Sequence, residues 1–392
     1  MWIPNNLRFQ RALFWFVVFA AAGLTGFLVF MFSGIYNVAA SVQHFDVTNR
    51  IIKIVLRRSI QTHSGGDAVP ALDDPGLVRL GANHYRIGCA PCHGSPAAEG
   101  SAVVARMYPA PPPLTHARED WSSEDLHWIV RNGLKFTGMP AWPGAGRSEE
   151  VWPLVAFIEA LPAMDGAEYD ALLASPQAGN AAERAGLDFG AQAAARRPLA
   201  TVTARCEACH GSGGAEPVAG LVPALAGQKA AYLARALKEY RDDVRQSGMM
   251  EPVAHDLDDA TIRALALHYA ASASPPAPAG AVRPGTPVGD VDRGGRIVRL
   301  GLPEARVAPC SACHGANRSD QFPRIGGLSS AYIVTQLELF RDGVRSASPH
   351  AEIMANVASH LDDAMMEDVA AYLAALPANP PQSPLAPPEA AR

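Results

Sequence analysis

The sequence predicts an all-α protein in which three small helical units follow an N-terminal transmembrane helix. Three observations support this fold class. Segments with the alternating polarity of β-strands are almost absent. All six cysteines fall into three C-x-x-C-H motifs, each over 100 residues from the next. An uncharged stretch of 21 residues lies close to the N-terminus.

The uncharged stretch runs from Ala12 to Phe32 and is long enough to span a bilayer as one helix. Arg8 and Arg11 precede it, as the positive-inside rule favours, although basic residues also follow it. A cleaved signal peptide is the alternative, with small residues at 38–40 as the cleavage site. The apolar stretch exceeds a usual signal core of about 7–15 residues. We therefore expect residues 1–40 to form a cytoplasmic stub and a retained anchor.

Residues 41–72 are expected to form a juxtamembrane stalk. From His44 to Ile60, apolar residues alternate with basic ones, which predicts an amphipathic helix. Such a helix lies on a membrane surface or simply connects the anchor to the next unit. The sequence leaves both possibilities open.

The three motifs predict covalent haem attachment. C-x-x-C-H is typical of c-type haem sites, in which two thiols bind the haem and the histidine binds its iron. Zinc sites share cysteine pairs between motifs and do not need a histidine after each pair, and a C-x-x-C disulfide closes a very small loop. We expect three haem c groups, with proximal ligands His93, His210 and His314 and attachment through Cys89, Cys92, Cys206, Cys209, Cys310 and Cys313.

The first haem-binding unit, called here the first region, is predicted to cover residues 73–163. Apolar spacing predicts a helix over 76–87, before the motif, and another over 149–161. Prolines at 109 and 111–113 exclude a regular helix between them. Residues 163–200 are rich in alanine and are expected to be a linker followed by the first helix of the next unit.

The second region (164–274) and the third region (288–376) form an internal repeat. Tyr232-Leu233 and Val244-Arg245 in one correspond to Tyr332-Ile333 and Val344-Arg345 in the other. Each repeat ends in a helix that begins after Leu-Asp-Asp. A Pro-rich linker is predicted at 275–287 and a disordered Pro-rich tail at 377–392.

A methionine that binds the iron on the face opposite the histidine fills its last open coordination position, which suits electron transfer. We expect each such methionine on a flexible segment before the last helix of its region. Met139, between glycine and proline, is favoured over Met107. Met250 and Met354 each lie seven residues before the Leu-Asp-Asp sequence, which favours Met250 over Met249.

Other residues near the haems have more ordinary interpretations. A backbone carbonyl near Pro223 or Pro323, or among prolines 109–113, can accept a hydrogen bond from the haem histidine. A second histidine ligand from His255, His350 or His360 is a less favoured alternative to methionine. No catalytic triad, carboxylate cluster or phosphate loop is evident.

In all three regions these motifs resemble the class I cytochrome c family. Gly81 and Tyr85 resemble its helix-crossing pair, and residues 201–376 resemble the diheme cytochrome c4 group. That resemblance implies the axial pairs His210–Met250 and His314–Met354, and three tandem helical domains. The third region departs from the pattern, since Ile325-Gly326-Gly327-Leu328 replaces Leu-Ala-Gly-Gln. The implied function is single-electron transfer in a bacterial respiratory chain, without substrate chemistry.

Composition limits the partners. The net charge is −5 and the pI is about 6.2, so nothing indicates nucleic-acid binding. Because c-type haem is attached outside the cytoplasm, we expect a single-pass inner-membrane protein with periplasmic haem domains. Its expected partners are other redox proteins, namely a respiratory complex, a dehydrogenase or a terminal oxidase. The alternatives are a subunit of a membrane-bound alcohol or gluconate dehydrogenase, and a haem peroxidase or gas sensor.

Overall fold

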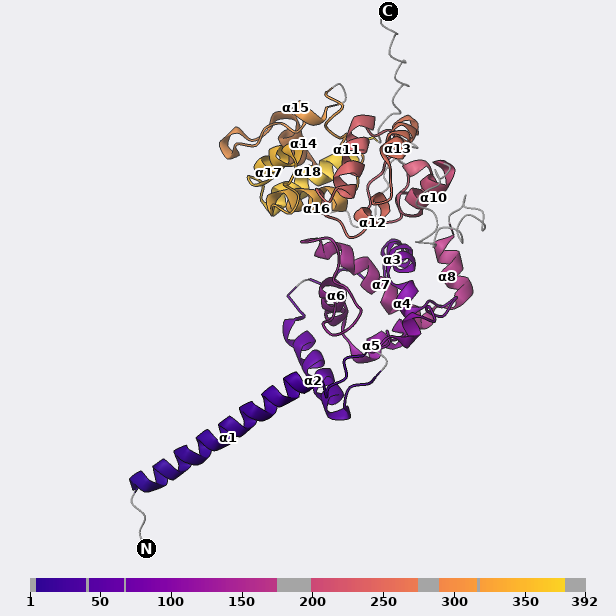
Figure 1. Ribbon diagram of the computed structural model, residues 1–392. Coiled ribbons are helices and arrows are strands. Elements are labelled where there is room, and N and C mark those ends of the chain that lie inside the picture. The colour runs from indigo at the N-terminus through magenta and orange to yellow at the C-terminus, as the bar shows by residue number, and fades with distance from the viewer. Residues whose placement is uncertain are drawn as a thin grey trace, which may run out of the picture.

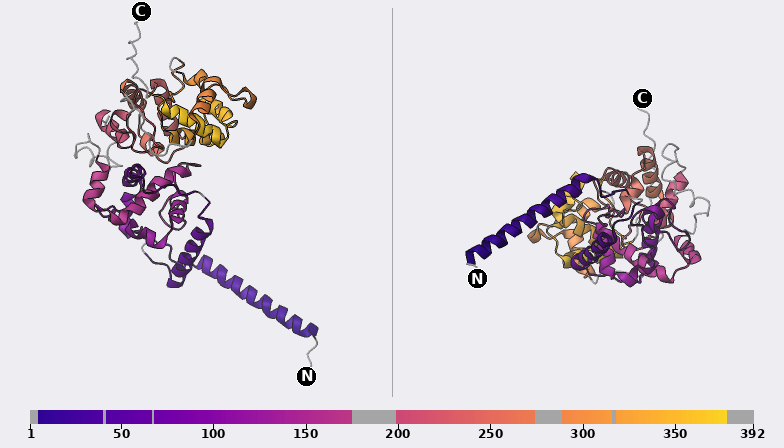
Figure 2. Two further views of the ribbon diagram at one scale, coloured as in Figure 1. Left: turned by 180° about the vertical axis from the view of Figure 1, so that it is seen from behind. Right: turned by 60° about the horizontal axis from the view of Figure 1, so that its bottom comes forward.

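The computed structural model describes residues 5–39, 42–66, 68–174, 199–273, 289–315 and 318–377. Within these ranges the chain forms α-helices and short 3₁₀ helices, with two isolated β-bridges and no strand, as the sequence predicts. Figure 1 shows the helices around the first motif as one layer, with those of the second and third motifs side by side above it, and Figure 2 shows the same arrangement from behind. The predicted linker at 275–287 and nearly all of the predicted tail lie outside the described residues.

The N-terminal helix α1 covers Asn5–Ser33 and contains the whole predicted span. It extends away from the rest of the protein (Figure 1). Within Leu7–Ser33, the most apolar 18-residue window has a mean hydropathy of 2.3 and is 0% buried. By length and composition this helix can cross a membrane, and a signal sequence has the same properties.

Helix α2 covers Asp46–His63 and packs by one face on the first region. Ile60 is buried, and Arg57 pairs with Asp120 at 2.8 Å beside helix α6 (Ser123–Asn132). The opposite face of α2 leaves Ile51 and Ile54 more than half exposed. The predicted helix is thus present. One side of it packs on the first region, and the apolar residues on the other side are left exposed in the described chain.

The core of the first region forms where α3 (Pro75–Gly88) crosses α7 (Trp152–Ala160), as the family resemblance implies. A Cβ atom on Gly81 would lie 1.9 Å from the carbonyl oxygen of Pro153, so only glycine permits this approach. One turn later, the Tyr85 ring lies 4.9 Å from that of Phe157. The Tyr85 hydroxyl donates to the carbonyl of Gly94 at 2.7 Å, which ties the crossing to the first motif.

The expectation of a linker directly after residue 163 is wrong, because helix α8 (Gly166–Leu173) forms there. Asp165 and Glu168 make a reciprocal capping box at its N-terminus. Tyr169 and Leu173, four residues apart, bury against the first core. These two signals outweigh the alanine-rich composition. Residues 175–198 lie outside the described part of the chain.

The remaining helices of the first region are α4 (Ala90–His93) and α5 (Ala117–Asp120).

The second and third regions repeat the same helix order. The second region contains α10 (Leu199–His210), α11 (Ala230–Arg241), α12 (Met250–Ala254) and α13 (Asp259–Ala271). The third contains α14 (Val291–Leu300), α15 (Ser311–His314), α16 (Ser330–Arg341), α17 (Pro349–Ala358) and α18 (Asp363–Ala375). Each repeat buries its own hydrophobic cluster.

The second and third regions are joined through backbone groups. Gln228 donates to the carbonyl of Arg324 and accepts from its N–H, both at 2.8 Å. The buried Lys229 donates to two carbonyls at 318 and 319. The third region has Leu328 where the second has Gln228, and Leu328 packs into the third core. The contact between the two regions is therefore asymmetric. Gln228 of the second region bonds to the third region, whereas Leu328, at the equivalent position, has no polar side chain with which to bond back.

Candidate haem centres

The first motif forms one helical turn at the end of α3. Asp74 caps α3 by accepting from Gly76 N, and α4 begins directly after Cys89. The N–H of His93 donates to the carbonyl of Cys89 at 2.9 Å, which places both thiols and the imidazole within one turn. Burial raises the pKa of Cys89 to about 12, while Cys92 is exposed. A cavity of about 300 Å³ lies against Cys92 and His93.

The second and third motifs form the same helical turn, but the helices that contain them differ. In the second region the motif completes the continuous helix α10. In the third, His314 N donates to the carbonyl of Cys310 at 2.9 Å within the turn that forms α15. Burial raises the pKa of Cys209 and Cys310 to about 11. Each motif thus presents two thiols beside one histidine, and burial raises the pKa of at least one of them.

Each motif histidine is oriented by a proline carbonyl. The Nδ1 atoms of His93, His210 and His314 lie 2.8 Å from the carbonyl oxygens of Pro112, Pro223 and Pro323. The expected contacts at Pro223 and Pro323 are confirmed, and Pro112 is the first-region residue that the sequence could not single out. Because a carbonyl can only accept, Nδ1 carries the proton and Nε2 keeps its lone pair for a metal. This donor set fits haem iron.

In the first region two methionines lie together. Met139 is in the loop between α6 and the 3₁₀ helix η3 (Ser148–Val151), where its N–H donates to Thr137 Oγ1 at 3.1 Å. A Cβ on Gly138 would lie 2.2 Å from the terminal methyl carbon of Met107, so Met107 packs directly on this loop. The structure brings both candidates to one place, and the choice of Met139 stays a prediction.

Met250 and Met354 occupy equivalent positions in the repeat. Met250 is the first residue of α12, and Met354 lies inside α17. Ala254 and Ala358, each four residues further on, are both 0% exposed. The expectation of a flexible segment is wrong for Met354, because Ser348 and Pro349 cap a ten-residue helix from the longer third-region loop. The roles of both methionines as ligands stay predictions.

The remaining histidines have varied contacts. His127 is buried, donates from Nε2 to the Ser148 carbonyl at 2.9 Å, and stacks on Trp152 with centroids 4.1 Å apart. His360 follows α17 and donates from Nδ1 to the carbonyl of Asn356 in its last turn. His350 contacts Phe322, whose ring also contacts His314. The structure does not test the bis-histidine alternative.

Sequence reasoning missed a pair of arginines between the second and third regions, the buried Arg245 and the half-buried Arg345. Arg245 is 4% exposed and donates to Gln336 Oε1 at 3.0 Å. Arg345 donates to the same oxygen at 2.5 Å. In the described chain neither guanidinium pairs with a carboxylate, and Arg245 also donates to the Tyr232 and Tyr332 hydroxyls at 3.4 and 3.3 Å. The propionate carboxylates of a bound haem would supply the negative charge that a buried cation needs. The signal was available, since both arginines occupy one repeat position.

Comparisons with known proteins agree with this geometry. The family model described as cytochrome c oxidase, cbb3-type, subunit III, matches residues 76–158 and 193–268, and the cytochrome c model matches 305–377.

Three relatives illustrate the similarity. A cytochrome c-552 of Acidithiobacillus ferridurans is 35% identical over 181 residues, covering 45% of this chain and 75% of that protein. A thiosulfate dehydrogenase electron acceptor of Thiomonas intermedia is 36% identical over 184 residues, covering 46% and 82%. A cytochrome c4 of Thiocapsa roseopersicina is 34% identical over 176 residues, covering 44% and 86%. The chain therefore belongs to the cytochrome c family, as an electron carrier with covalently bound haem c and a segment similar to cytochrome c4.

Proposed function

We propose that the chain is a membrane-anchored triheme cytochrome that relays single electrons between periplasmic or membrane redox partners of a bacterial respiratory chain. One observation carries this proposal: three C-x-x-C-H turns, each with its histidine Nδ1 held 2.8 Å from a proline carbonyl. Bound haem iron supplies reversible one-electron exchange. The protein holds, orients and insulates the sites.

We assign the axial pairs as His93–Met139, His210–Met250 and His314–Met354. In each pair the proline carbonyl orients the imidazole, and the methionine would supply a thioether sulfur as the second protein ligand of a bound haem. Two protein ligands would leave no position for an exogenous ligand, which favours a carrier over a peroxidase or gas sensor. The arginine pair at 245 and 345 supplies positive charge for haem carboxylates between the second and third regions.

We assign α1 as a retained single-pass anchor in the inner membrane, with the haem regions in the periplasm. The support is the length and apolar composition of Leu7–Ser33. Alkaline carbonate extraction of membranes, with N-terminal sequencing of the mature protein, tests this assignment. Release of a chain that begins near residue 40 would refute it in favour of a signal peptide.

Haem number and ligation are tested on the purified holoprotein. Pyridine haemochrome analysis with intact mass should give three haems per chain. Near-infrared magnetic circular dichroism should show methionine charge-transfer bands for all three ferric haems. Met250→Ala should abolish one band, whereas Met249→Ala, the matched control, should abolish none. A high-spin haem that binds carbon monoxide in the wild-type reduced protein would favour the sensor or peroxidase alternative.

A dehydrogenase is the electron donor that one observation favours, because relatives in two organisms are named thiosulfate dehydrogenase electron acceptors. In this second version the chain is the cytochrome subunit or partner of a periplasmic dehydrogenase. Affinity purification from native membranes distinguishes the two versions. A cofactor-bearing catalytic chain that copurifies supports a subunit, and recovery of the cytochrome alone supports an independent relay.

A further inference from the structure

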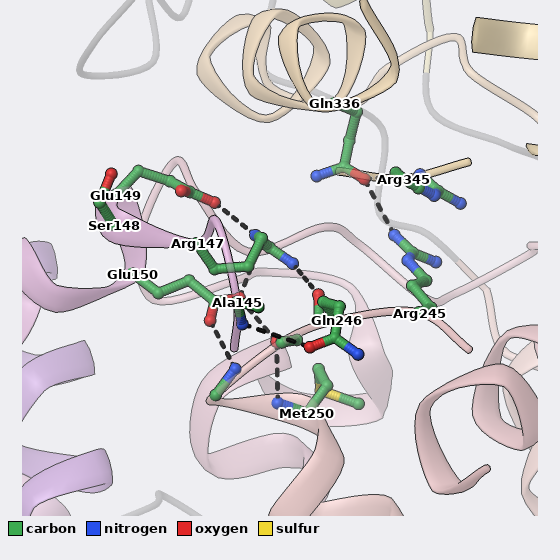
Figure 3. A network of polar contacts seen from close by, with 12 residues as sticks. Ala145, Arg147, Ser148, Glu149, Glu150, Arg245, Gln246, Met250, Gln336 and Arg345 are labelled. Atoms are coloured by element: carbon green, nitrogen blue, oxygen red, sulfur yellow. Dashed lines mark hydrogen bonds and ion pairs between the residues drawn. The ribbon is translucent and has the colours of Figure 1, made fainter. Parts of the chain in front are cut away.

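The first region meets the second region at the buried carboxylate of Glu150. Glu150 lies in η3, and its side chain is 8% exposed. Its Oε1 accepts from Ser247 Oγ and pairs with Arg147 Nη2, each at 2.6 Å. Its Oε2 accepts from Gly248 N at 2.8 Å, and Figure 3 shows the surrounding network. A buried carboxylate is costly unless several donors surround it, so these bonds tie the two regions together.

Ser247 connects this carboxylate to Met250. Its hydroxyl donates to Glu150 and accepts from the N–H of Met250 at 3.0 Å. Met250 begins α12, where backbone N–H groups lack partners within the helix, and the Ser247 hydroxyl supplies a partner for the N–H of Met250. The N–H of Ser247 donates to the Glu251 carboxylate at 2.6 Å, which bonds Ser247 to α12 a second time. Glu150 is therefore two hydrogen bonds away from the backbone of Met250.

The segment before Met250 is held at other points as well. Arg147 Nη1 donates to the carbonyl of Gln246 at 2.5 Å. A Cβ on Gly248 would lie 2.3 Å from the Trp142 ring, so the first region packs directly on this backbone. Arg245, at the start of the segment, is bonded to Gln336 of the third region. Residues 245–250 thus lie between two neighbours that both bind them (Figure 3).

The first region also contacts the second haem motif. Asn83 of α3 donates from Nδ2 to the carbonyl of Ala208 at 3.2 Å, and Ala208 lies between Cys206 and His210. The contacts of the first region thus reach both segments on which the second haem depends, namely its attachment motif and the segment carrying its expected methionine.

We propose that Glu150 is a positioning residue for the second haem: it holds the segment that carries Met250, so that the first region sets the ligation and potential of the second haem. The proposal rests on the proposed function in one respect, the assignment of Met250 as a ligand. Glu150 acts through Ser247 and Gly248, and loss of its carboxylate frees the start of α12.

The test uses the full-length holoprotein in detergent and two readouts, potentiometric titration and the near-infrared methionine bands. Glu150→Ala should shift one of the three potentials and weaken one band. Ser247→Ala, which removes a single oxygen, should affect the same haem. Since both act through one contact, the double variant should shift that potential no further than the larger single variant. Glu149→Ala is the matched control, because Glu149 also bonds to Arg147, at 2.6 Å.

Two results would overturn the proposal. In the first, Met250→Ala removes one band, but Glu150→Ala and Ser247→Ala leave all potentials and bands unchanged. The assignment of Met250 as a ligand then stands, and the positioning role of Glu150 fails. The other is an equal shift in Glu149→Ala. If Met250→Ala leaves every band intact, the assignment of Met250 itself fails and the positioning role fails with it. Where Glu150→Ala yields no folded holoprotein, Ser247→Ala decides.

Discussion

Replacing Gln228 by alanine should loosen the contact between the second and third regions. Gln228 is 3% exposed, and its amide makes three hydrogen bonds to backbone groups. Nε2 donates to the carbonyl of Arg324 at 2.8 Å, while Oε1 accepts from Arg324 N at 2.8 Å and Lys229 N at 2.9 Å. The alanine variant removes all three bonds and supplies no substitute partner.

The expected effect follows from those bonds. A hydrogen bond contributes about 1 kcal/mol net, so the two bonds that cross to Arg324 contribute about 2 kcal/mol. Because about 1.4 kcal/mol corresponds to a factor of ten, local opening at this contact should become about 30-fold more frequent. Hydrogen exchange of backbone amides reports this opening when reclosing is fast. Peptides that cover residues 318–330 should therefore exchange about 30-fold faster in the variant.

Gln321→Ala is the matched control for this measurement. Gln321 is a glutamine at the same contact, but it is exposed and bonds to the Arg235 side chain at 2.9 Å. Its removal should change the opening free energy by less than about 0.5 kcal/mol. If Gln228→Ala accelerates exchange no more than Gln321→Ala does, the bonds from Gln228 do not stabilise the contact, and the reasoning is wrong.

Other predictions concern packing, protonation and charge. Gly81→Ala should lower the unfolding free energy of the first region by about 1–3 kcal/mol, because its Cβ meets a backbone carbonyl; urea unfolding followed by tryptophan fluorescence checks this, since all six tryptophans precede residue 153. Burial lowers the pKa of His84 from 6.5 to about 4, so the folded state binds fewer protons than the unfolded state between these values. Stability should therefore fall as pH drops from 6.5 towards 4, and His84→Gln should flatten this dependence in thermal unfolding curves. Arg245→Met should lower the potentials of the second and third haems, since it removes a buried positive charge; potentiometric titration with unchanged values would refute the propionate role.

Short-range patterns predicted much of this protein. The C-x-x-C-H turns are local, because five consecutive residues in a helical turn bring two thiols and an imidazole together. Gly81 and Tyr85 marked the helix crossing, and the repeat aligned Met250 with Met354 by counting from Leu-Asp-Asp. Helix α8 was also within reach of the sequence, through the capping box at Asp165 and Glu168, but its alanine-rich surroundings suggested a linker.

Long-range contacts were decided by the tertiary structure alone. The sequence by itself determined the haem motifs, the helical class and the candidate ligands, because these depend on residue type and spacing within a few turns. Three hydrogen bonds depend on how distant segments pack together: His93 with the carbonyl of Pro112, Gln228 with Arg324, and Glu150 with Ser247. Glu150 and Ser247 are 97 residues apart. Buried polar groups must find partners wherever the packed chain supplies them, and no local pattern specifies a partner at that separation.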